Sequence, residues 1–364
     1  MGKERITDKE GIFLIIIFVF GSSLIIGGGG DAKNDAWIAA MVAMIMVAPM
    51  LFVYSRLLML FPGKDIFDIF NGIYGKVIGK IVSIVYILYS FHLGVLVFRN
   101  FGEFINIVAM PETPMLVSLI SLGIVCIIGV SLGIEVLARI TAYFLPVILF
   151  IIFLVELLSI SESHLNYLKP ILGNGLAPVL KGGFDTFSFP FAETVLFIGV
   201  FDSLKSKKSP LKVYFWGILI SGMILVSAII RNITVLGNML GSFYFPSYEA
   251  VSMISMGDYL QRIEITVSIV FVYGIFVKTS ICLLVTCKGI KKLFGLADYR
   301  SIVIQTGLLM VYFAYIIYDN SMLMQYWAFE VYSYYAFPMQ VIIPIITWIF
   351  AEIKGRKKAA VIRN

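Results

Sequence analysis

The sequence predicts an all-α polytopic membrane protein with ten transmembrane helices. Of the 364 residues, 60% are hydrophobic and only 14% are charged, and the mean hydropathy is +0.97. Soluble proteins carry about 25% charged residues, so this little charge cannot cover a surface in water. Apolar runs of about 20 residues, the length that crosses a bilayer, also recur along the chain. We therefore expect a single membrane domain, residues 1–364.

The ten spans follow from runs with few acidic or basic residues, with Glu156, Glu193 and Lys278 as isolated ionisable groups inside three of them. They are expected at residues 11–30, 36–55, 81–98, 113–134, 138–160, 182–203, 213–230, 262–287, 301–318 and 331–351. The first run is expected to remain as a helix, because no small-x-small cleavage site follows it. The segments between spans are too short for a soluble catalytic, nucleotide-binding or DNA-binding domain.

The basic residues indicate the orientation of the spans. If the N-terminus is inside, most of the 28 Lys and Arg residues fall in cytoplasmic segments. By the positive-inside rule both termini are then cytoplasmic. The formal net charge of +6 is explained in this way, so nucleic acid is not expected as a partner. Cys126, Cys282 and Cys287 lie in apolar runs without a CxxC pair or a neighbouring His, so neither a metal nor another cofactor is expected.

The first and sixth spans contain helix-breaking residues. The first carries Gly21-Ser22-Ser23, and the sixth carries Pro190, which lacks an amide hydrogen and clashes with the preceding turn. Either feature alone is compatible with an ordinary kink or with close helix packing. Breaks at corresponding positions of two halves instead indicate a 5+5 inverted repeat with a ligand bound between them at mid-membrane. The two repeats are expected at residues 11–160 and 178–352.

The broken spans supply the first candidate ligand-binding residues. A half-helix N-terminus presents amides with partial positive charge, which suit a ligand carboxylate. In the first span these candidates are Gly21, Ser22, Ser23 and Leu24. In the sixth span, Phe189, Pro190 and Phe191 are expected to form a wall that sets ligand size. Glu193 must face a partner or a cavity, because a carboxylate inside a membrane is costly, and both roles remain open.

Five segments along the chain carry a family resemblance: Gly21–Ser23, Asn34–Ile38, Leu168–Gly175, Phe245–Glu249 and Gly257–Glu264. With them the chain resembles the endospore germination permeases, the B subunits of GerA-type nutrient germinant receptors. These belong to the amino acid–polyamine–organocation superfamily. The resemblance implies a LeuT-like fold, a small nutrient ligand that is often an amino acid, and a place in the spore inner membrane. It also implies an A subunit and a lipoprotein C subunit as partners. One departure is Gly28-Gly29-Gly30, which replaces a Pro often found after the first break.

The resemblance extends the candidate site to the third and eighth spans. In this superfamily the third helix lines the central site, which makes Phe91, His92 and Val95 candidates, although plain packing also explains them. In the eighth span, Lys278 and Cys282 lie where related transporters bind sodium. The Lys278 ammonium is expected either to replace sodium or to contact the ligand carboxylate. The alternative is a structural pair with Glu193 or another buried acid. The Tyr and Trp residues of 312–335 are expected in an interfacial belt.

Two functions remain open on the sequence alone. The first is a nutrient-sensing subunit of a germinant receptor, whose bound state is detected by its partner subunits. The second is a proton- or sodium-coupled amino acid transporter. An enzyme is not expected, because the sequence contains no GxSxG, no HExxH and no intramembrane Asp pair.

Overall fold

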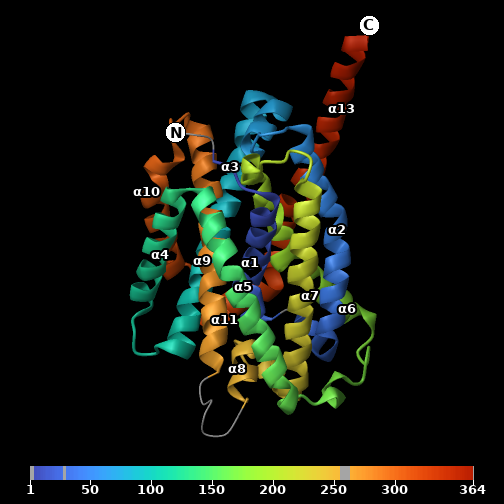
Figure 1. The fold of residues 1–364 in the computed structure, drawn as a ribbon, viewed down its shortest axis with the longest axis vertical. Coiled ribbons are helices and arrows are strands. Elements are labelled where there is room, and N and C mark those ends of the chain that lie inside the picture. The colour runs from blue at the N-terminus through green and yellow to red at the C-terminus, as the bar shows by residue number, and fades with distance from the viewer. Residues whose placement is uncertain (1–3, 28–29, 255–262, 364) are drawn as a thin grey trace.

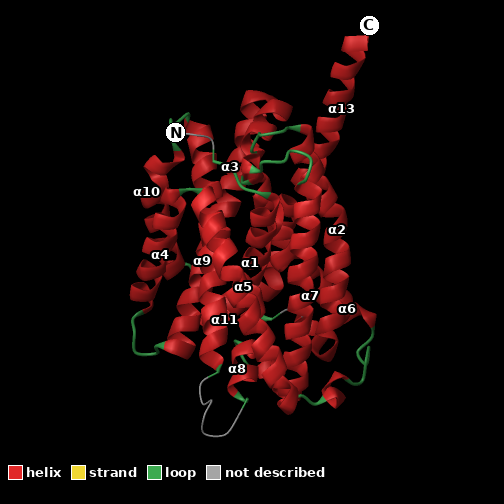
Figure 2. Ribbon diagram, viewed as in Figure 1, coloured by secondary structure: helices red, strands yellow, loops and turns green. Residues whose placement is uncertain are grey.

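The computed structural model describes residues 4–27, 30–254 and 263–363. Across these ranges the chain forms a bundle of helices without a β-strand (Figure 2). Most long helices run along the longest axis of the bundle, and the two ends of the chain lie at the same end of it (Figure 1). The all-α membrane fold expected from hydropathy is confirmed.

The helices alternate in direction along the bundle and are joined by short connections. Their bounds are α1 Asp8–Ile26, α2 Ala36–Leu60, α3 Ile66–Phe104, α4 Met115–Leu132, α5 Ile134–Leu158, α6 Leu176–Thr186, α7 Pro210–Leu236, α8 Pro246–Ser252, α9 Glu264–Phe294, α10 Val303–Ile316, α11 Ser321–Tyr326, α12 Tyr332–Phe337 and α13 Ile343–Arg363. Helices α11 to α13 continue one another through π-helical turns and form the last span.

Nine helical segments in the described part of the chain are long and apolar enough to cross a membrane. They correspond to nine of the ten predicted spans. The remaining one, the predicted sixth span, is divided into shorter helical pieces. Two boundaries were predicted wrongly. The last span begins at Ser321 rather than at residue 331, and α3 begins at Ile66 rather than at residue 81. Lys76 and Lys80 lower the hydropathy of the early part of α3, so the sequence pattern did not indicate that this part belongs to the helix. There α3 turns sharply at Gly75, whose φ of 80° suits glycine.

Helix α1 is the centre of the bundle and is broken where the sequence predicted. Every residue from Leu14 to Ile25 is buried, so the helix is apolar on all sides. Gly21 departs from helical geometry with φ 8° and ψ −117°. The hydroxyl of Ser23 donates to the carbonyl of Val19. The break is therefore tolerated because a side chain of the same helix satisfies a nearby backbone group.

The sixth span is broken at Pro190, also as predicted. It consists of α6, a π-helical turn Phe187–Phe191 and a 3₁₀-helix Ala192–Gly199. Within the turn Phe189 is extended, with φ −129° and ψ 112°, and so separates the two helical pieces. The broken segments of the first and sixth spans contact each other, as the edge-to-face pair of Phe18 and Phe197 shows, with ring centroids 5.1 Å apart.

Candidate functional site

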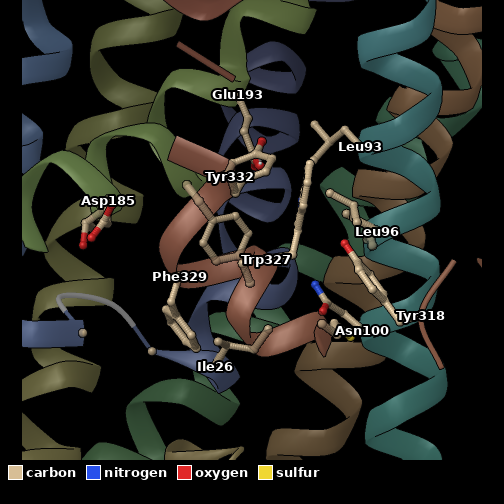
Figure 3. A pocket seen from close by; sticks show the side chains of 17 residues that line it. Ile26, Leu93, Leu96, Asn100, Asp185, Glu193, Tyr318, Trp327, Phe329 and Tyr332 are labelled. Carbon is tan, nitrogen blue, oxygen red and sulfur yellow. Dashed lines mark hydrogen bonds between the residues drawn. The ribbon is translucent and has the colours of Figure 1, made fainter. Parts of the chain in front are cut away.

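A cavity of about 70 Å³ lies beside the two broken helices and is large enough to hold ordered water. Its wall comes from the outer end of α1, from α3, from the broken sixth span and from the segment that follows α10 (Figure 3). The lining residues are Ile26, Gly27, Gly30, Leu93, Leu96, Val97, Asn100, Asp185, Thr186, Phe189, Glu193, Tyr318, Met324, Trp327, Ala328, Phe329 and Tyr332. The lining is mostly apolar and aromatic with few polar groups, which is typical of a small-molecule site.

A wider hollow of about 600 Å³, the vestibule, adjoins this cavity. The two share five wall residues, namely Ile26, Gly27, Gly30, Asp185 and Phe329. The vestibule is bordered by the chain between α7 and α8, at the end of the bundle opposite the termini (Figure 1). Through the vestibule, the cavity is therefore connected to the face of the bundle that carries α8. At the opposite end of the bundle, near the termini, Lys288 pairs with Asp202 at 2.6 Å.

The polar centre of the wall is a buried ion pair between Glu193 and Lys278. Glu193 Oε2 lies 2.5 Å from Lys278 Nζ, and both side chains are fully buried. Glu193 Oε1 accepts a hydrogen bond of 2.5 Å from the Tyr332 hydroxyl. The ammonium lies 4.5 Å from the ring centroid of Phe189 and 5.3 Å from that of Phe18. Two aromatic faces and one carboxylate thus surround the Lys278 charge, which offsets part of the cost of burying it.

Of the roles that the sequence left open for Lys278, the structure has the buried ion pair with Glu193. Lys278 lies behind Glu193, off the cavity wall. Within the described part of the chain, Nζ makes no hydrogen bond to a carbonyl of helix α1. Cys282, one turn further along α9, is buried against α3 next to Gly94 and does not line the cavity. Direct ligand contact by either residue stays a prediction.

The predicted residues of the first break are buried but do not line the cavity. Helix α9 covers the break: a Cβ on Gly21 would lie 2.7 Å from Lys278 Cδ. Ser22 accepts a hydrogen bond of 3.2 Å from Asn100, and the carbonyl of Leu24 accepts one from Ser247. Ser23 is turned back onto its own helix. The residues of α1 that reach the wall come later in the chain, and the expected carboxylate contact at Gly21–Leu24 stays a prediction.

The face of α3 that lines the cavity also differs from the expected one. Phe91 packs on Phe313, with ring centroids 5.7 Å apart, and His92 packs on Trp327 at 5.8 Å. Val95 is buried in the core. The wall is formed instead by Leu93, Leu96, Val97 and Asn100. These positions share one helical face through their spacing of three and four residues.

In the sixth span two of the four predicted residues line the cavity. Phe189 and Glu193 are on the wall, whereas Pro190 and Phe191 are buried behind it. Trp327 and Tyr332, expected in an interfacial belt, face the cavity instead. The Trp327 indole Nε1 is buried and has no hydrogen-bond partner in the described ranges. Such a donor is costly unless water or a ligand satisfies it.

Two features of the sequence analysis lie outside the described residues. These are Gly28 and Gly29, in the departure from the family pattern, and most of the resemblance segment Gly257–Glu264.

Phe189→Ala is expected to shift ligand preference toward bulkier molecules, because it removes an aromatic ring from the cavity wall. Apolar walls discriminate by about 1–3 kcal/mol per methylene-sized change, so a partial shift is expected rather than a loss of binding. The matched control is Phe191→Ala, which removes an equal ring from behind the wall and costs stability alone. Competition binding across a series of small molecules of increasing size measures the shift. An equal shift in both variants would contradict the assignment of the wall.

Comparison with known protein families identifies relatives over most of the chain. The sequence pattern of the family described as "Spore germination protein" matches residues 5–322. Spore germination protein KB of Bacillus subtilis (strain 168) is 32% identical over 299 residues, which cover 81% of this chain and 80% of that protein. Spore germination protein XB of Bacillus anthracis is 23% identical and covers 68% of this chain and 69% of that protein.

Two solved transporter structures share the fold. Mhp1, a nucleobase-cation-symport-1 family transporter solved in a closed conformation with bromovinylhydantoin, aligns with a TM-score of 0.66 over 94% of this chain and 78% of that one. MhsT in complex with L-phenylalanine aligns with a TM-score of 0.63 over 97% of this chain and 99% of that one. Both are 12% identical to this chain, so the likeness concerns the fold.

Proposed function

The chain belongs to the spore germination protein family and has a LeuT-like transporter fold, and from this premise we propose that it is the nutrient-sensing B subunit of a germinant receptor. It binds a small nutrient, an amino acid, in the cavity beside the broken helices. The occupied cavity favours one arrangement of the bundle, and partner subunits detect that arrangement.

One observation carries this proposal: the cavity is walled by the C-terminal end of α1, by α3, by the broken sixth span and by the last span, and it continues into a vestibule. A ligand in this position contacts α1, α3, the sixth span and the last span together. Its binding energy therefore acts on the relative placement of four helices, which is what a conformational sensor requires.

The polar groups on the wall support an amino acid as the ligand. The unpartnered Nε1 of Trp327 is a donor suited to a carboxylate oxygen. Asn100 supplies a side-chain amide, which also donates to Ser22 on α1. The apolar lining, including Leu93 and Leu96, suits a hydrocarbon side chain.

The proposal includes location and partners. The chain resides in the spore inner membrane with both termini on the spore-core side, as the distribution of Lys and Arg favours. The vestibule then opens away from the core, toward the source of nutrients. An A subunit and a lipoprotein C subunit complete the receptor.

The test uses the full chain in lipid nanodiscs and in liposomes, with the twenty common amino acids as probes. At least one amino acid is expected to raise the melting temperature, because a ligand at 100 times its dissociation constant adds about 2.7 kcal/mol of stability. The same amino acid is expected to trigger germination of spores that contain the intact receptor. No concentrative uptake into liposomes is expected.

The alternative, a coupled amino acid transporter, is favoured by the transporter fold and predicts the opposite liposome result. Concentrative uptake driven by a proton or sodium gradient, with the purified chain alone, would establish transport and overturn the sensor proposal. The control is the double variant Leu93→Trp/Leu96→Trp, which fills the cavity wall and should abolish both the stabilisation and any uptake.

A further inference from the structure

The charges around the cavity do not cancel. Glu193 is neutralised by Lys278, so the pair adds no net charge to the wall. The other charged residue of the wall is Asp185, which is half-buried and belongs to both the cavity and the vestibule. In Figure 3 it stands to one side of the cavity, apart from Glu193 and Tyr332.

Asp185 has no cation of its own among the residues that the structure describes. Its Oδ1 accepts a hydrogen bond of 2.7 Å from the Ser333 hydroxyl, which fixes the carboxylate without neutralising it. Lys181, one turn earlier on α6, is engaged elsewhere: its Nζ lies 2.6 Å from Asp31 and 3.4 Å from Glu330. One ammonium thus already serves two carboxylates on the vestibule wall, and the described residues form no ion pair with Asp185.

We propose that Asp185 is the charged anchor of the site and binds the ammonium group of the nutrient. This rests on the proposed function and deepens it, because it names the charged group that the site recognises. Ligands with a primary ammonium enter, with or without a carboxylate, and carboxylic acids that lack the amine are excluded. A fixed carboxylate in a partly desolvated wall attracts a cation more strongly than it would in water, and it repels an anion by the same effect.

The position of Asp185 gives the ligand a direction. Since the residue borders both spaces, an incoming ammonium meets it at the boundary between the vestibule and the cavity. The remainder of the ligand then extends along the apolar and aromatic wall toward Leu93 and Trp327. Aromatic faces beside the ammonium add to the preference for a cation.

The first test measures charge preference without relying on any nutrient. Ala328, which is exposed on the cavity wall, is replaced by cysteine in the full chain in nanodiscs. The native cysteines Cys126, Cys282 and Cys287 are all buried, so labelling reports on the new thiol. The modification rate with the cationic 2-aminoethyl methanethiosulfonate is divided by the rate with the anionic 2-sulfonatoethyl reagent. This ratio is expected to fall about tenfold on adding Asp185→Asn.

The matched control for charge is Asp31→Asn, which removes the same charge from the vestibule but from a carboxylate paired with Lys181. Its effect on the rate ratio is expected to be clearly smaller. Asp185→Ser is a second variant in case the asparagine protein does not fold, and retained reactivity of Ala328→Cys with a neutral reagent confirms folding. An unchanged ratio in Asp185→Asn, or an equal fall in Asp31→Asn, overturns the proposal.

The second test separates this proposal from the proposed function. L-valine, isobutylamine and isovalerate share one carbon skeleton and differ in the charged groups. At millimolar concentration, L-valine and isobutylamine are expected to protect Ala328→Cys from a neutral reagent, and isovalerate is not. Protection by isovalerate equal to that by valine overturns the ammonium anchor. If the rate ratio falls as expected but none of the three protects, the ammonium preference stands and the amino acid ligand is what fails.

Discussion

Lys278→Met is expected to lower the free energy of unfolding by about 3–5 kcal/mol, the usual cost of removing one partner of a buried ion pair. In this variant the carboxylate of Glu193 keeps its hydrogen bond from Tyr332 but loses the only cation near it in the described structure. The carboxylate then stays charged in a buried position without a cation partner, which is costly. The measurement is unfolding of the purified chain in mixed micelles with increasing SDS fraction.

The double variant Lys278→Met/Glu193→Gln isolates the ion pair as the cause. Glutamine keeps an acceptor for the Tyr332 hydroxyl while removing the charge, so most of the lost stability should return. Lys288→Met is the matched control on the same helix. Its partner Asp202 is 20% exposed and can be solvated, so a smaller loss is expected. If the double variant is no more stable than Lys278→Met, the pair does not account for the stability of this region.

Hydropathy and helix-breaking residues were sufficient to predict the ten spans and both breaks, because each leaves a local signal. Gly21 and Pro190 act on the backbone at their own positions. Glu193 and Lys278 were both noticed for the same reason, since a charge in an apolar run stands out. Which acid would pair with Lys278 was not predictable, because that depends on how the two helices rotate against each other.

The residues of the cavity wall were predicted less well, and the cause is the burial of the helices themselves. The last turns of α3, residues 93–104, are buried on all sides, with Leu93, Val95 and Val97 each at most 2% exposed. An apolar helix of this kind carries no polar face to show which side meets the cavity. Trp327 and Tyr332 are ambiguous for another reason, since aromatic residues near a helix end suit both a membrane interface and a ligand site.

Gly274→Ala is expected to be a strongly destabilising single-methyl addition, because Gly274 is the glycine of α9 that faces α1. A Cβ at this position would lie 2.9 Å from the backbone N of Gly21 and 3.0 Å from its Cα. Backbone atoms inside a packed bundle cannot turn aside as a long side chain can. Helices α1 and α9 must therefore separate, at a cost of about 1–3 kcal/mol for the overpacking alone.

The separation should also disturb the ion pair. Lys278 follows Gly274 by one helical turn and lies on the same face of α9, so a shift of α9 away from α1 draws Nζ from Glu193. Gly21→Ala is the informative comparison, since its Cβ would meet the flexible Cδ of Lys278 at 2.7 Å, and its loss of stability should be smaller.

Gly72→Ala serves as the matched control for adding a methyl group, because a Cβ there meets nothing within 4 Å. Alanine is the better helix former by about 1 kcal/mol, so this variant should be neutral or slightly more stable. SDS unfolding of the three variants gives the expected order of stability: Gly72→Ala highest, then Gly21→Ala, with Gly274→Ala lowest. A Gly274→Ala protein as stable as Gly72→Ala would mean that α1 and α9 are not in backbone contact at the first break.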